Sequence, residues 1–255
     1  MAKGVSIKFV SYEETVPKVL RAIKLDEELK KHQTILIKPN LLNKEDAYTP
    51  VDFADAVVKF CVQHKLPEAQ ILVVEGSDGQ DTMDIFEHKG YKTLAEKYGV
   101  ALVDLNKTEA ELIGDNSFLA NHEIMFPSLL KEGFLISLPV LTKHDRHDIT
   151  GSLSNMLGAY PAKHYKGFFS KTKNKLVGPT KYQIHDIVKC KMPSLALIDA
   201  HAYGAILAWQ PLEVDKQAAK LLGIDPKSIA HLRIIEESLH QQKTKNDATN
   251  DGGLQ

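Results

Sequence analysis

The chain has 255 residues, of which 43% are hydrophobic and 25% are charged, and its formal net charge is −1 at pH 7. These values are typical of a soluble globular protein with its own core, and the lack of a basic excess disfavours a dedicated nucleic-acid-binding protein. Cys61 and Cys190 show no paired spacing suited to zinc, an iron–sulfur cluster or a disulfide framework, so we expect reduced thiols. The first residues lack the apolar core of a signal peptide, and no apolar run reaches the roughly 18 residues of a membrane span. We therefore expect a cytoplasmic protein without a membrane partner.

Strand-like and helix-like patterns alternate along the chain. Short apolar runs predict strands at residues 5–10, 34–37, 71–74, 100–105, 134–138 and 195–198. Apolar residues at helical spacing predict helices at residues 13–23, from Thr49-Pro50 to about residue 60, through residues 85 and 94, and at residues 214–222. This alternation predicts a single α/β domain over residues 1–240, with a mostly parallel, doubly wound sheet and helices on both of its faces.

Two segments break the alternation. Residues 159–182 interleave six lysines with aromatic residues and have little periodicity, which indicates a long surface loop or flap. Such a flap suits an anion-binding lid or a solvated connection, and a strip that binds single-stranded nucleic acid is disfavoured because nothing else in the chain supports it. Residues 241–255 are nearly devoid of apolar side chains and are predicted to be a disordered tail.

Polar residues follow the predicted strands where each strand ends. Lys38, Glu75 and Asp199 come directly after apolar runs, and Lys143 follows the strand at residues 134–138 after a short turn. Parallel strands bring their carboxyl ends to one edge of the sheet, where ligands of open α/β sheets bind. We expect these side chains to share that edge.

The densest polar cluster lies in residues 143–148, between the strand at 134–138 and a glycine-punctuated stretch that contains Asn155. His144 can transfer protons near neutral pH, and Lys143 can stabilise negative charge that develops in a transition state, so both are predicted catalytic residues. His144 and His147 could also meet one metal if they lay on a helical turn. The sequence holds no HExxH-type motif, and a charged surface turn accounts for the same letters, so no metal is assigned.

The order of several short motifs resembles the family known as domain of unknown function 362. The motifs are Ile37-Lys38-Pro39-Asn40-Leu41, Thr49-Pro50, Glu75-Gly76-Ser77, Gly90-Tyr91, Leu138-Pro139-Val140-Leu141 with Lys143-His144, Thr150-Gly151 with Asn155 and Gly158, Asp199, and Val214-Asp215 leading to Leu222-Gly223. The resemblance spans about residues 5–235 and implies an α/β fold with a shared polar site. This chain departs from the family pattern at Thr142-Lys143-His144, at Ser154, at Gln210-Pro211 and in a shortened segment between Asp199 and Asp215, and it lacks the ferredoxin-like module of many relatives.

The remaining candidates each have a functional and a structural interpretation. Glu75 suits a general base or a ligand clamp, and the alternative is a structural cap of the next helix that uses Glu75, Ser77 or Asp78. The predicted substrate-binding residues have alternatives as solvated side chains, turn residues, caps or partners of nearby lysines, and they are Lys38, Asn40, Ser77, Asn155, Asp199 and Asp215.

The sequence contains no phosphate-binding P-loop, no GxGxxG fingerprint after a strand and no GxSxG elbow, which argues against ATP hydrolysis, Rossmann-type hydride transfer and lipase-like chemistry. We expect an enzyme that acts on a small anionic metabolite by acid–base chemistry, as an isomerase, racemase or lyase. The alternative is a non-catalytic protein that binds an anionic ligand. An iron–sulfur-linked redox accessory is disfavoured by the missing cysteines, and the sequence identifies neither a cofactor nor an oligomeric state.

Overall fold

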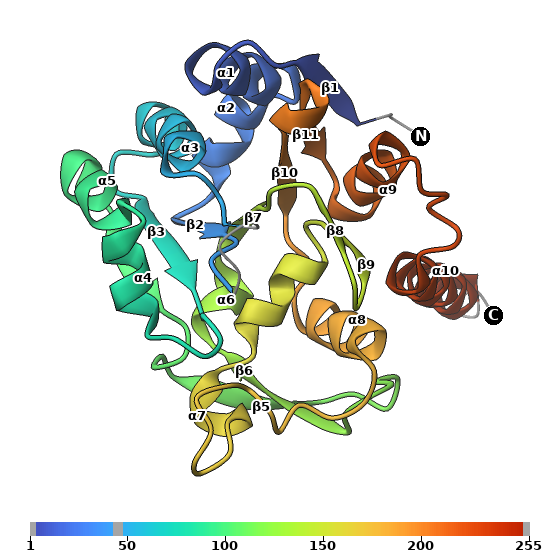
Figure 1. Cartoon of the computed structure of the whole chain (residues 1–255). Coiled ribbons are helices and arrows are strands. Elements are labelled where there is room, and N and C mark those ends of the chain that lie inside the picture. Colours follow the sequence, from blue (N-terminus) through green and yellow to red (C-terminus); the bar gives the residue numbers. More distant parts are fainter. Residues whose placement is uncertain (1–3, 43–47, 252–255) are drawn as a thin grey trace.

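The computed structural model describes residues 4–42 and 48–251, and it is a mixed α/β fold built around one large sheet (Figure 1). Within the described residues, the sheet has seven strands in the order β1-β11-β10-β7-β2-β3-β4. Strands β10, β7, β2, β3 and β4 pair in parallel, while β11 runs antiparallel to both of its neighbours. The predicted α/β class and mostly parallel sheet are therefore confirmed, and the doubly wound connectivity stays a prediction.

The strands of this sheet follow the predicted apolar runs, with one addition. They are β1 (Val5–Lys8), β2 (Thr34–Pro39), β3 (Gln70–Glu75), β4 (Ala101–Asp104), β7 (Phe134–Leu138), β10 (Leu195–Ala200) and β11 (Ala205–Trp209). Strand β11 was not predicted, because it follows β10 after a turn of only four residues and its apolar run reads as a continuation. Gly204 closes that turn at φ 76°, a conformation that glycine adopts without a steric penalty.

The longer helices alternate with the strands. They are α1 (Tyr12–Ala22), α3 (Val51–His64), α4 (Thr82–His88), α5 (Tyr91–Tyr98), α8 (Thr180–Cys190), α9 (Pro211–Leu221) and α10 (Ala230–Asp251). Shorter turns are α2 (Leu25–Glu28), η1 (Leu29–Lys31), α6 (Leu129–Glu132), η3 (Ser154–Ala159), α7 (Ala162–Tyr165) and η4 (His201–Tyr203). Side chains cap the amino-terminal ends of α1 and α4. Ser11 accepts from the backbone N–H of Glu14, and Asp81 accepts from those of Met83 and Asp84.

Alternate strand residues pack into two separate core clusters. Ile35 and Ile37 of β2 join the cluster covered by α1, α3, α4 and α5, whereas Leu36 joins the cluster covered by α8, α9 and α10. Figure 1 shows the first group of helices in blue to green and the second group in orange to red, on opposite sides of the strands. This period of two is the pattern of a strand buried on both faces.

Several segments differ from the sequence-based expectation. Residues 110–127 form a hairpin of β5 (Ala110–Gly114) and β6 (Glu123–Pro127), and a second hairpin is made of β8 (Thr142–His144) and β9 (Asp148–Thr150). The predicted flap at residues 159–182 is partly ordered as α7 and the start of α8. Helix α10 extends through Asp251, and the disorder expected for residues 241–255 stays a prediction. Residues 252–255 lie outside the described residues.

No helix in the described ranges combines the length and the hydropathy that a membrane span requires.

Helix α10 supports the β8–β9 hairpin through a buried histidine. His231 is 1% exposed, and neither of its ring nitrogens has a hydrogen-bond partner among the described residues. Its ring lies perpendicular to that of His147, with 6.2 Å between centroids. Burial, and then the proximity of His147, lowers the pKa of His231 to about 3, while burial and then His144 lower the pKa of His147 to about 4. Both imidazoles are therefore neutral at pH 7.

We expect acid to destabilise the fold through these histidines. In the unfolded chain each imidazole titrates near its ordinary pKa of about 6.5, so the unfolded state takes up protons first as the pH falls, and each unit of pKa difference lowers the unfolding free energy by about 1.4 kcal/mol. The loss starts below pH 6.5 and continues toward the native pKa values of about 4 and about 3. Urea unfolding from pH 7.5 to 4 should show a smaller loss for His231→Leu than for the wild type. His240→Leu, which changes an exposed histidine of the same helix, should match the wild type, and an unchanged profile in His231→Leu would contradict the assignment.

Candidate functional site

The carboxyl ends of β2 and β3 are joined by a fully buried ion pair. Lys38 Nζ lies 2.8 Å from Glu75 Oε1, and both side chains are 0% exposed. Glu75 also accepts from the backbone N–H of Gly76 at 2.7 Å and from that of Leu41 at 2.9 Å. Burial lowers the pKa of Lys38, and the Glu75 carboxylate opposes that shift. The structure thus places both residues at the predicted edge, but pairs them with each other.

Asn155 completes the surroundings of this pair. Its Oδ1 accepts from Lys38 Nζ at 3.1 Å, while its Nδ2 donates to the Lys38 carbonyl and to Ser137 Oγ. Gly158 lies three residues further along the same short helix, and its backbone packs against the same groups. A Cβ at this position would lie 2.2 Å from Glu75 Oε1 and 2.6 Å from Lys38 Nζ. The close approach explains the need for glycine there.

A polar cleft of about 760 Å³ opens beside the buried pair. Asn40, Lys143, His144 and Asn155, four of the five residues predicted to converge, line it. The fifth, Lys38, lies beneath the lining and is held by Asn155. Other lining residues include Asp78, Asp145, Arg146, His147, Thr150, Lys173 and Asn174. Four of the five residues therefore line one cleft, and their role in binding an anion stays a prediction.

The β8–β9 hairpin carries the exposed basic side chains Lys143 and Arg146 of this cleft. Lys143 and Arg146 are exposed, and neither forms a salt bridge with a residue that the structure describes. His144 Nδ1 accepts from the backbone N–H of Arg146 at 3.1 Å, so the neutral ring carries its proton on Nε2. The hairpin therefore presents positive charge and a proton-exchanging group to the same space.

The alternative of a metal between His144 and His147 supposed that both residues lie on one helical turn, and the structure has no such turn at these described residues. The two residues lie on a hairpin, where Asp148 adopts φ 69°, and their rings stack with centroids 3.6 Å apart. His147 Nδ1 donates to the Ile149 carbonyl at 2.8 Å. Across residues 4–42 and 48–251, no three His, Cys, Asp or Glu side chains group closely enough to hold a metal ion.

Two predicted binding residues instead stabilise the backbone. Ser77 is buried, and its Oγ donates to the Leu41 carbonyl at 2.9 Å. Asp215 in α9 accepts from the backbone N–H groups of Ser152 and Leu153 and from Ser152 Oγ. Burial raises the pKa of Asp215 to about 6, and these hydrogen bonds oppose the shift. Neither residue lines the cleft, and both side chains anchor the turns around it.

Asp199 lies at the predicted edge, but its carboxylate binds His201, a residue that was not predicted from the sequence. The Asp199 carboxylate is buried and accepts from the Tyr12 hydroxyl at 2.7 Å and from His201 Nδ1 at 2.9 Å. The His201 side chain is 41% exposed. The sequence Asp199-Ala200-His201 places an aspartate and a histidine two residues apart at a strand end, and this spacing could have indicated that the two side chains interact. Neither Asp199 nor His201 lines the cleft, so this dyad is a separate feature of the edge.

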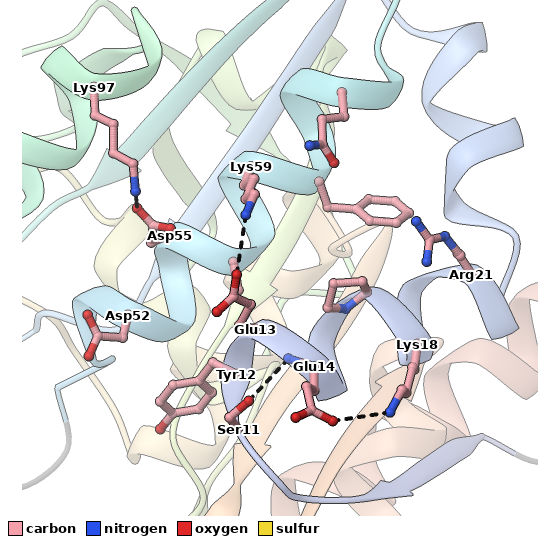
Figure 2. A pocket seen from close by; sticks show the side chains of 14 residues that line it. Ser11, Tyr12, Glu13, Glu14, Lys18, Arg21, Asp52, Asp55, Lys59 and Lys97 are labelled. Atoms are coloured by element: carbon pink, nitrogen blue, oxygen red, sulfur yellow. Dashed lines mark hydrogen bonds and ion pairs between the residues drawn. The ribbon is translucent and has the colours of Figure 1, made fainter.

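A second hollow of about 800 Å³ lies between α1 and α3 (Figure 2). Figure 2 shows its charged side chains pairing across the groove and along the helices, as Lys59 with Glu13, Lys18 with Glu14 and Lys97 with Asp55. These pairs cancel much of the local charge. We therefore place the candidate site in the cleft at the strand ends, where Lys143 and Arg146 form no salt bridge with any residue of the ranges 4–42 and 48–251.

Comparison with protein-family models matches residues 35–205 to the family described as "Domain of unknown function (DUF362)", which covers more than half of the chain. No curated protein matches the chain.

The buried pair should dominate the stability of the edge. Lys38→Met leaves the Glu75 carboxylate buried without its cation, so we expect a loss of roughly 3–5 kcal/mol in unfolding free energy, because such charges are poorly solvated. Adding Glu75→Gln removes the uncompensated charge and should recover part of the loss. Chemical denaturation of the three proteins measures both effects.

The matched control is Lys92→Met, which breaks an ion pair of 3.1 Å whose side chains are 57% and 64% exposed. Exposed pairs contribute at most about 1 kcal/mol. Similar losses in Lys38→Met and Lys92→Met would show that burial does not set the energetics of the Lys38–Glu75 pair.

Proposed function

The chain belongs to the DUF362 family, whose function is unknown, and from its own cleft we propose that it binds a small anionic metabolite and transforms it by acid–base chemistry. The observation that carries the proposal is the presence of two cations, Lys143 and Arg146, that form no salt bridge within the described residues and lie on a hairpin that lines a cleft at the carboxyl ends of parallel strands. Ligands of α/β sheets bind at this position. Cationic side chains there would hold a carboxylate or a phosphate.

His144 is the proposed acid–base group. Its ring orientation is fixed by the Arg146 N–H on Nδ1 and by the stacked ring of His147, which leaves Nε2 as the proton-carrying atom of the neutral ring. The buried His147 stays neutral at pH 7 because its pKa is about 4, so it adds no positive charge next to His144. Isomerisation, racemisation and elimination next to a carboxylate all need one such proton transfer.

We do not include Glu75 among the proposed catalytic residues. Its carboxylate already accepts from Lys38, Gly76 and Leu41, so it cannot take a proton from a ligand without breaking the buried pair. This observation favours the second candidate function, a protein that binds an anion without transforming it. The amides of Asn40 and Asn155, which line the cleft, suit either function.

Anion binding should depend on the hairpin cations. We expect inorganic phosphate or malonate to raise the melting temperature of the wild type, and Lys143→Ala or Arg146→Ala to weaken binding about fivefold each, since an exposed charge pair contributes up to about 1 kcal/mol. Calorimetric titration at low salt measures the affinities. Lys30→Ala, which changes an exposed lysine outside the cleft lining, should bind like the wild type. Equal binding by all four proteins would refute the cleft as the anion site.

Proton transfer separates the two candidate functions. In deuterated water, an acid–base enzyme should exchange the hydrogen next to the carboxylate of a bound 2-hydroxy or amino acid, and proton NMR detects the loss of that signal. His144→Gln should abolish exchange and leave phosphate binding within about twofold, because Lys143 and Arg146 still supply positive charge in the cleft. His122→Gln changes an exposed histidine outside the cleft and should exchange normally. Binding without exchange across the panel would leave only the binding function.

A further inference from the structure

Lys173 is a buried lysine at the cleft that the proposed acid–base step does not use. It lies on the connection between α7 and α8 and is 5% exposed, whereas Lys171 and Lys175 on either side are exposed. Its side chain lines the cleft that also holds Lys143 and His144. This one lysine of the predicted flap therefore points inward.

Lys173 Nζ is held by two backbone carbonyls. It donates to the Gly76 carbonyl at 2.7 Å and to the Gly158 carbonyl at 3.2 Å, and its backbone N–H donates to Asp78 Oδ1 at 2.7 Å. Gly76 is packed so tightly that a Cβ there would lie 2.3 Å from the Gly158 carbonyl oxygen. The cradle for Nζ is thus made of closely apposed backbone, which fixes its position.

The number of acceptors matches a neutral amine. An ammonium has three N–H donors, whereas a neutral amine has two donors and one lone pair. Two carbonyls accept from Lys173 Nζ, and within the described residues no carboxylate lies in ion-pair range of it, in contrast to Lys38. A third buried N–H without an acceptor would be costly, so the geometry favours the amine.

Burial acts in the same direction. It lowers the pKa of Lys173 to about 8, and Lys38 adds to that shift, while the carboxylates of Glu75, Asp78 and Asp104 oppose it. At pH 8 such a lysine has roughly a hundredfold more neutral amine than an exposed lysine with a pKa near 10.4. A desolvated lysine next to another cation is one of the ways in which proteins activate an amine nucleophile.

We propose that Lys173 forms an imine with the carbonyl group of a 2-oxo carboxylate bound in the cleft, an inference that rests on the proposed function of that cleft. Lys143 and Arg146 hold the carboxylate, and the ligand displaces one of the two carbonyl contacts to reach Nζ. The Nζ lone pair attacks the carbonyl carbon, and the oxygen leaves as water with the two amine protons. The net step, amine and ketone to imine and water, needs no oxidant or reductant.

An imine at Lys173 would also provide the proton that the proposed acid–base group, His144, removes. A protonated imine withdraws electrons from the adjacent carbon, so a hydrogen on that carbon becomes acidic enough for a histidine to remove. His144 lines the same cleft. A small 2-oxo acid with a hydrogen next to its carbonyl group is the substrate class that fits the two hairpin cations, the Lys173 amine and His144.

Borohydride trapping tests the proposal on the full chain. The protein is incubated with pyruvate or glyoxylate at pH 8 and reduced with sodium borohydride, and the adducts are mapped by peptide mass spectrometry. We expect one adduct per chain at Lys173, formed with a rate that rises with pH around a midpoint near the pKa of about 8. Lys173→Arg should lose the adduct, whereas Lys171→Arg and Lys175→Arg should label like the wild type. Labelling of the wild type that is spread over Lys171 and Lys175, or that is absent from Lys173, would overturn the proposal even if Lys173→Arg fails to fold.

A second readout separates this proposal from the proposed function. If phosphate binds to the wild type in the Lys143-dependent manner but neither oxo acid is trapped at Lys173, the cleft binds anions and the imine is refuted. If Lys173 is trapped but phosphate does not bind, and Arg146→Ala does not slow the trapping, the imine is supported and the anion site is refuted. Phosphate that binds and also slows trapping at Lys173 supports both.

Discussion

The buried contact between Lys38 and Glu75 is the constraint on which the candidate site depends. It joins the carboxyl ends of two adjacent parallel strands, where backbone groups leave the sheet and need new partners. The Glu75 carboxylate supplies acceptors for the N–H groups of Leu41 and Gly76, so one charge pair organises the loops after both strands. Removing water from this pair is costly, and its full set of hydrogen bonds is what makes it tolerable.

This arrangement divides the edge of the sheet into two layers. The inner layer contains the charge pair, Asn155 and the closely packed Gly158, and each polar group in it is directed at another. The outer layer is the β8–β9 hairpin, whose Lys143 and Arg146 have no such partners in the described part of the chain. A rigid inner layer that positions a chemically available outer layer is the arrangement expected of a ligand site.

Lys173 connects the two layers, because it lines the cleft and its Nζ donates to the carbonyls of Gly76 and Gly158. The connection between α7 and α8 is thereby tied to the strand ends by one side chain. Two lysines of this edge are buried in different ways: Lys38 beside a carboxylate, and Lys173 between two carbonyl oxygens. The difference in partners, more than the difference in burial, separates a structural ammonium from a proposed nucleophile.

The sequence by itself determined the strands of the sheet other than β11, their parallel arrangement and the gathering of Lys38, Glu75 and Asp199 at one edge, because apolar runs of fixed period specify buried strands. The family resemblance was also correct. Only the tertiary structure decided which of these polar residues pair with each other, since Glu75 meets Lys38 across strands 37 residues apart, and Asp199 meets Tyr12 across 187. Partners that distant leave no local pattern, so the sequence could show which residues reach the edge but not which remain available for a ligand.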